Sequence, residues 1–262
     1  MSYISYFKSA ALDLFGSTGG QTSTDLSLSV EVGQKFTSQD GREFVLVQNG
    51  GTALVSGVLV QSPASIGANH TGLATATAAI GATQITVTLG GTAVTANQYA
   101  GGFAIISAGT GIGQTLRIAS HPAQTSTSGT VVLTLEDPLS VATLTSDSKT
   151  SLTLPQYGSR YGATFTTSGV VVCPTTATGA VIGATLYPIP ASSTTACSYG
   201  YIQTKGFIGI LNGANTSIGL DVMPGGSVAG SVVTYVVATR SRVGTATVAG
   251  EDTKVQGVNL QL

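Results

Sequence analysis

The chain has few charged residues. Asp, Glu, Lys and Arg make up 8% of its 262 residues, against roughly 25% in an ordinary soluble protein. Thr, Ser, Ala and Gly stand where charged surface residues are usual, and a charged surface normally keeps soluble proteins apart. The composition therefore favours a part that packs against copies of itself or a partner over a freely diffusing enzyme.

Long apolar runs are also missing. A membrane-spanning helix needs about 20 consecutive apolar residues, and Gly, Ser, Thr, Asn or Gln interrupts every apolar run of this chain well before that length. The net charge is −1 and the Lys and Arg residues are scattered. No basic run therefore exists to hold a nucleic-acid backbone or an anionic membrane surface. We expect neither a nucleic acid nor a membrane as a partner.

Cysteine is scarce as well, with only Cys173 and Cys197 present. Two cysteines without a close-spaced motif favour two buried thiols, and a disulfide between them stays open as the alternative. The N-terminal residues lack the regions of a secretory signal, because Lys8 interrupts them and no long apolar run follows. We therefore expect the protein to be made and used in a cytoplasm.

Tryptophan is absent and helix signals are almost absent, whereas Gly, Thr and Val are frequent. Thr and Val are stiff at χ1 and suit a pleated sheet. One short helix is expected around Tyr6–Leu14. The remaining pattern predicts an all-β protein, in which a small β-barrel or sandwich body built from N- and C-terminal segments carries an inserted β module.

Strand-like segments recur at a spacing of about 8–12 residues with glycine turns, as is typical of a barrel or sandwich. Asp40-Gly41 marks one hairpin turn. The division that we expect is an N-terminal arm at 1–30, a body made of 31–71 plus 155–262, and an inserted all-β module at 72–154. The expected strands include 53–61, 74–91, 101–109, 114–120, 130–139, 149–155, 167–174, 198–211, 226–240, 242–249 and 254–262.

The expected arm carries several aromatic rings, among them Tyr3, Tyr6, Phe7 and Phe15, followed by the polar, glycine-rich stretch 16–24. Such a stretch is flexible and has no core of its own. The arm has too few residues to bury its rings alone, and each ring carries a large apolar area. We expect these four side chains to contact a neighbouring subunit or a partner, with a disordered tail as the alternative.

The search for catalytic residues gives no candidate. His70 and His121 have no metal-site spacing around them. GTGIG at 109–113 lacks the third glycine and the following helix of a dinucleotide-binding loop, so it predicts a glycine hairpin. Glu136 and Asp137 are adjacent, unlike the separated carboxylates of glycosidases. No nucleophile-elbow motif occurs, although a triad is defined by geometry and stays open. We expect no enzyme activity, cofactor or metal.

Six β-rich patterns carry a family resemblance. They are DGREFVLVQNGGTALVSGVLVQSPA at 40–64, NQYAGGFAIISAGTGIGQTLRIASHPA at 97–123, TVVLTLEDPLSVATL at 130–144, SYGYIQTKGFIGIL at 198–211, IGLDVMPGGSVAG at 218–230 and VNLQL at 258–262. They resemble segments of tailed-bacteriophage capsid decoration proteins, also called cement proteins. Together they extend over most of residues 30–262.

The resemblance implies a structural virion protein that binds the outer surface of an icosahedral phage head and stabilises it. Its partners would be the major capsid protein and further copies of itself in a homotrimer, and it would reach the virion from the host cytoplasm. Another phage structural protein, such as a tail-tube, baseplate or fibre component, is the first alternative. A carbohydrate-binding or hydrolytic β-protein is the second, although the lack of Trp and the 6% aromatic content count against it.

Overall fold

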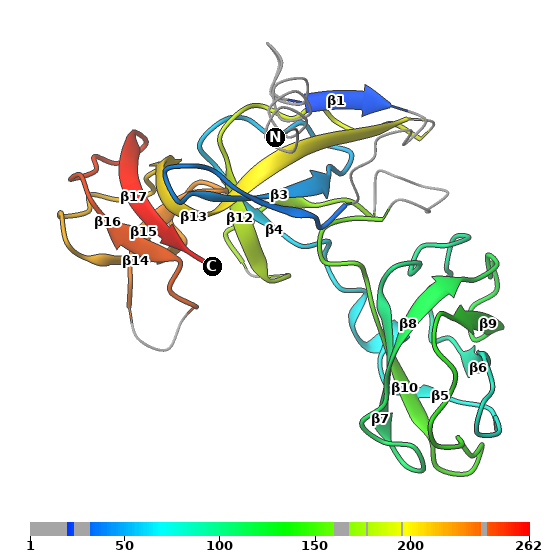
Figure 1. The fold of residues 1–262 in the computed structure, drawn as a ribbon. Helices are drawn as coiled ribbons and strands as arrows, with labels where there is room; N and C mark the ends of the chain where they lie inside the picture. Colours follow the sequence, from blue (N-terminus) through cyan, green and yellow to red (C-terminus); the bar gives the residue numbers. More distant parts are fainter. Residues whose placement is uncertain (1–19, 24–31, 160–167, 177, 195, 237–239) are drawn as a thin grey trace. The chain divides into compact units, whose positions relative to one another are not determined.

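The computed structural model describes residues 20–23, 32–159, 168–176, 178–194, 196–236 and 240–262. It is all-β, with 2% helix and 43% strand, and its antiparallel sheets curl into two barrel-like bodies (Figure 1). This confirms the predicted fold class, a barrel body built from N- and C-terminal segments with an inserted β module. The helix expected at 6–14 lies outside the described residues.

The chain divides into two compact units, one formed by 1–63 with 165–262 and the other by 64–164. The second unit is thus wider than the 72–154 expected from the sequence. Hydrogen bonds explain why the unit extends beyond the expected range at both ends. His70, in the short 3-10 helix η1 (Gly67–His70), bonds to Tyr99 and to Thr92. At the other margin the Ser159 hydroxyl donates to the Ala100 carbonyl.

The second unit is a nearly closed six-stranded barrel. Its strands are β5 (Leu73–Ala74), β6 (Gln84–Thr88), β7 (Phe103–Ala108), β8 (Thr115–Ser120), β9 (Thr130–Leu135) and β10 (Lys149–Thr153). They pair in the order β5-β10-β7-β8-β9-β6, and a bridge between Thr75 and Val87 brings the two ends of the sheet together. Closure of this kind removes free strand edges that would otherwise pair with other chains.

Alternation of side chains fills the interior of this barrel. In β9, Val131, Leu133 and Leu135 are buried while the residues between them are more exposed, as the two-residue period of a strand requires. The core also contains Leu73, Ile85, Val87, Leu89, Val94, Tyr99, Ala104, Ile106, Leu116, Ile118, Leu139 and Leu152. The inserted module therefore has a hydrophobic core of its own.

The first unit contains a sheet of eleven strands. They are β1 (Gly20–Ser23), β2 (Lys35–Thr37), β3 (Glu43–Gln48), β4 (Leu59–Gln61), β11 (Val171–Val172), β12 (Val181–Thr185), β13 (Cys197–Leu211), β14 (Asp221–Pro224), β15 (Val232–Thr234), β16 (Gly244–Ala246) and β17 (Val255–Gln261). The main path runs β11-β4-β12-β13-β17-β16-β14-β15, and β1 and β3 also pair with β13.

Strand β13 organises this unit. Over its 15 residues it pairs with β1, β3 and β12 along its first half and with β17 along its second half. The register with β3 shifts between Gln203 and Lys205, and Gly206 has a φ of +91°. A glycine adopts this backbone conformation without the steric cost that other residues meet. The irregularity bends the strand so that its two halves serve different parts of the curled sheet.

The described residues of the first unit form two apolar clusters that stabilise it. The larger one lies inside the curl and contains Leu59, Cys173, Ala184, Ile208, Ile210, Val222, Val232, Val243, Ala246, Val258 and Leu260. The smaller one gathers Phe44, Leu46, Cys197, Tyr199 and Tyr201 from β3 and β13. The ends of the curled sheet approach each other at Gly230, whose N–H donates to Cys173 and whose carbonyl accepts from Leu59.

Three segment predictions were wrong in detail. Of the strand expected at 226–240, residues 237–239 lie outside the described residues. Within 226–236 only β15 is a strand, because Gly226 and Gly230 take positive φ values of +100° and +78° and turn the chain. The stretch 74–91 is split into β5 and β6 by the turn at Gly81. Within 16–24, expected to be flexible, residues 20–23 form β1 against β13.

Candidate functional site

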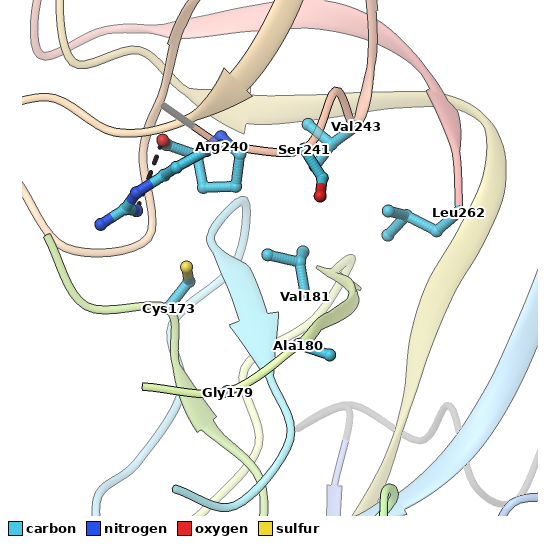
Figure 2. Close-up of a pocket in the computed structure, with 9 residues that line it drawn as sticks. Cys173, Gly179, Ala180, Val181, Arg240, Ser241, Val243 and Leu262 are labelled. Carbon is cyan, nitrogen blue, oxygen red and sulfur yellow. Dashed lines mark hydrogen bonds between the residues drawn. The ribbon is translucent and has the colours of Figure 1, made fainter. Parts of the chain in front are cut away.

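The first unit contains a half-enclosed pocket of about 280 Å³. Figure 2 shows that its walls come from separate parts of the chain: Cys173 follows β11, Val181 begins β12, and Ser241 and Val243 precede β16. The remaining lining residues are Gly179, Ala180, Pro224, Arg240 and Leu262. Most of the wall is therefore apolar, and among the described lining residues Arg240 is the only one with a charged side chain.

Arg240 is held in place by backbone carbonyls. Its guanidinium donates to the carbonyl of Pro174 at 3.3 Å and to that of Pro224 at 3.4 Å, the bond drawn in Figure 2, and it also donates to the Thr175 carbonyl. Within the described part of the chain, no carboxylate pairs with it. The pocket thus presents an oriented positive charge beside an apolar wall.

Cys173 contributes a thiol that is only 3% exposed, and its sulfur points toward the space between Arg240 and Val181 (Figure 2). Burial raises the pKa of this thiol, and the charge of Arg240 opposes that effect. The thiol is neutral at physiological pH and is not an activated nucleophile, which requires a lowered pKa. Cys197 is also free and buried, so the prediction of two thiols is confirmed.

The two histidines hold the second barrel together. The Nε2 of His70 lies 2.9 Å from the Thr92 carbonyl, which only accepts, so this nitrogen donates and the Nδ1 accepts from the Tyr99 hydroxyl. His121 Nδ1 donates to the Pro122 carbonyl at 2.9 Å, and its Nε2 accepts from the backbone N–H of Tyr99 at 3.0 Å. Burial lowers the pKa of His121 and raises that of Tyr99. Both rings are committed to structural hydrogen bonds.

This arrangement predicts a pH-dependent stability. Because the pKa of His121 is lowered in the folded chain, the unfolded chain binds the proton more readily below about pH 6.5, the ordinary histidine pKa. The stabilising contribution is complete above that value and is lost as the pH falls through it toward the folded pKa. We expect His121→Gln to cost about 1 kcal/mol at neutral pH and to flatten the fall of the thermal midpoint on acidification. Calorimetry gives the thermal midpoint of both proteins at each pH. Carboxylates present in both proteins contribute equally to the two curves, so the difference between the curves reports on His121. Parallel curves would contradict its assigned role in the pH dependence.

Other groups considered from the sequence do not converge. GTGIG at 109–113 forms the hairpin connection between β7 and β8, as expected. Glu136 pairs with Arg117 at 3.3 Å on the surface. Among the described residues, no three His, Cys, Asp or Glu side chains gather where they could hold a metal ion. The predicted contact residues Tyr3, Tyr6, Phe7 and Phe15 lie outside the described residues.

Exposed apolar side chains gather at one end of the second barrel. Ile80 and Ile112 are 69% and 66% exposed, and Val141 is about half exposed. Their loops are joined because Gly81 and Leu139 share a backbone hydrogen bond. The Gln114 side chain bonds to the carbonyls of Gly111 and Val141 and accepts from Ser140 and Val141 N–H groups. We call Ile80, Ile112 and Val141 the apolar tip, and these hydrogen bonds hold its loops in position.

A second exposed apolar face lies on β13 and β17. Gly209 and Gly257 are directly paired between these strands. A Cβ placed at Gly257 would lie 2.8 Å from the Phe207 ring, and one at Gly209 would lie 2.9 Å from Val255. Phe207 and Val255 therefore lie over the two glycines, yet each remains more than half exposed. Exposed apolar groups of this kind mark interaction surfaces when they form patches.

Comparisons with known proteins identify no relative, since no family model, curated protein or solved structure matches the chain. Among the described residues, no helix has the length and apolar character needed to cross a membrane.

Proposed function

We propose that this protein is a structural virion component that binds the outer surface of an icosahedral phage head and stabilises it. The observation that carries the proposal is the pair of exposed apolar surfaces, the apolar tip and the Phe207–Val255 face, on two barrels of a charge-poor chain. Exposed apolar side chains that gather into patches mark interaction surfaces. The six patterns that resemble decoration proteins supply the phage setting. The partners are the major capsid protein and other copies of this chain, in a homotrimer.

The use of the chain's polar groups supports a structural role. Both histidines are bound within the barrel of the second unit, and Cys173 is a neutral buried thiol. Surface charges are paired locally, as in Arg42–Asp40 and Lys205–Glu43. A barrel that buries its own strand edges gains rigidity and presents side chains instead of open backbone to its neighbours. Such a body suits a part that reinforces a shell.

The decisive experiment locates the protein on the particle. Antibodies against the folded chain, visualised by electron microscopy on intact phage, are expected to label the outside of heads at regular positions. Purified chain added to heads that lack it is expected to restore the labelling and to raise the temperature at which heads break, because ligands that bind the assembled state stabilise it. Label confined to tails, baseplates or fibres would contradict the proposal in favour of those components. Binding to glycans with heads unlabelled would favour the carbohydrate-binding alternative.

A further inference from the structure

A second pocket of the first unit lies beside the exposed Phe207 ring. It is open to solvent and has a volume of about 410 Å³, within the range of about 300–1,000 Å³ that is usual for small-molecule pockets. The residues that line it are Asp40, Arg42, Gly206, Phe207 and Asn259. Phe207 and Asn259 are directly paired between β13 and β17, so their side chains project from the same face of the sheet.

The pocket has hydrogen-bonding groups that the described part of the chain does not use. The Nε of Arg42 donates to the Asp40 carboxylate at 2.7 Å, and its guanidinium carbon lies 5.5 Å from the centre of the Phe44 ring. Among the described residues, no acceptor meets the terminal nitrogens of Arg42 and no partner meets the Asn259 amide. Gly206 leaves room for this arrangement, because a Cβ there would lie 2.7 Å from the Arg42 Cγ.

The charges around the pocket cancel in pairs. Arg42 is paired with Asp40, and Lys205 is paired with Glu43 at 2.9 Å. An anionic ligand would compete with Asp40 for the guanidinium and would be repelled by its carboxylate. A wholly apolar ligand would cover the Asn259 amide and the guanidinium without giving them hydrogen bonds, which is costly. The pocket therefore favours a neutral ligand with several polar groups.

The Phe207 ring adds a requirement for an apolar face on the ligand. The ring is 58% exposed although it carries a large apolar area. Its face is electron-rich and attracts C–H groups that neighbouring oxygen atoms make slightly positive. A sugar ring has such C–H groups on its faces and hydroxyl groups around its rim. Hydroxyls both donate and accept, which matches an amide and a guanidinium–carboxylate pair.

We propose that the pocket of Phe207, Asn259 and Arg42 binds one unit of a neutral saccharide. A C–H face of the sugar lies on the Phe207 ring, its hydroxyls accept from the terminal nitrogens of Arg42, and the Asn259 amide bonds to further hydroxyls. This goes beyond the proposed function, because the reinforcement of a head requires no sugar site.

Binding of neutral sugars to the full-length chain tests the site. The probes are maltotriose, lactose and N,N′-diacetylchitobiose, measured by saturation-transfer NMR and by calorimetric titration. We expect at least one probe to bind. Phe207→Leu is expected to weaken that binding by about tenfold through loss of the ring, and Asn259→Ala by about fivefold through loss of a hydrogen bond. Phe207→Tyr keeps a ring and is expected to keep the binding. Both positions are exposed, so the thermal midpoint is expected to stay at the wild-type value.

Matched variants and probes define the controls. Val255→Ala changes the same face outside the pocket and is expected to leave sugar binding unchanged. Methyl glucuronide differs from methyl glucoside by one negative charge and is expected to bind the wild-type chain no better, whereas Asp40→Asn frees the guanidinium charge and is expected to reverse that order. Tighter binding of methyl glucuronide by the wild-type chain would overturn the inference.

Two further outcomes would also overturn it: no binding of any neutral probe, or binding that persists in a chain carrying both Phe207→Leu and Asn259→Ala. Head labelling is scored separately. We expect the Asn259→Ala chain to label heads as the wild-type chain does. Labelled heads without sugar binding by the wild-type chain would overturn the inference and leave the proposed function in place.

Discussion

Gly109→Ala is expected to unfold the barrel of the second unit at a much lower temperature than the wild-type protein. Gly109 has a φ of +76°, and a Cβ at this position would lie 2.3 Å from the carbonyl oxygen of Asp147. Asp147 cannot retreat freely, because its carboxylate accepts from both the N–H and the hydroxyl of Thr110. We expect a loss of about 3 kcal/mol or more, seen in calorimetry as a drop of about 10 °C.

The same loop offers a matched control. Gly113 also has a positive φ, +92°, but nothing lies within 4 Å of an added Cβ. Gly113→Ala therefore carries only the backbone strain, about 1–2 kcal/mol. Equal destabilisation by the two variants would contradict the steric explanation. A nucleotide-binding loop would behave differently again, since both variants would then lose a ligand while the fold stayed intact.

Local sequence pattern predicted much of the strand content. Between turns, apolar residues alternate with other residues or follow one another in the segments TVVLTL and CSYGYIQTKGFIGIL. These segments form β9 and β13 close to the expected limits. Asp40-Gly41 was expected to turn the chain and does so between β2 and β3. The stretch 226–236 was wrongly expected to be one strand because its Val and Thr residues favour strands, whereas Gly226 and Gly230 have positive φ and turn the chain. Strand β12 had no prediction, since VIGAT is short and owes its order to β4 and β13.

The sequence pattern could not predict the pocket. Cys173 and Arg240 are 67 positions apart in the chain, and no motif links them. They meet because the curled sheet brings the segment after β11 next to the segment before β16. The orientation of Arg240 depends on the carbonyls of Pro174, Thr175 and Pro224, which carry no side-chain signal. The apolar tip could not be predicted either, because Ile80, Ile112 and Val141 look in the sequence like ordinary residues of strands or turns.

Deleting residues 1–19 is expected to leave a folded body that binds heads at least about tenfold more weakly. The deletion stops before Gly20, because residues 20–23 pair with β13 and belong to the sheet. It removes Tyr3, Tyr6, Phe7 and Phe15, the side chains that we expect at subunit or capsid contacts. A ligand stabilises the assembled state in proportion to its occupancy, so heads mixed with the truncated chain are expected to break at a lower temperature than heads coated with the full chain.

A full-length variant separates the rings from the length of the arm. Replacing Tyr3, Tyr6, Phe7 and Phe15 by Ser together keeps the arm's length and its charges, and we expect it to bind heads as weakly as the deletion. Asp13→Asn keeps every ring and removes only the charge, so we expect it to bind heads like the full-length chain. Head binding and head breakage temperature that both stay at wild-type values after the deletion would mean that the arm makes no contact of consequence. The stabilising surface would then be sought on the apolar tip and on Phe207 and Val255, which remain exposed in the folded body.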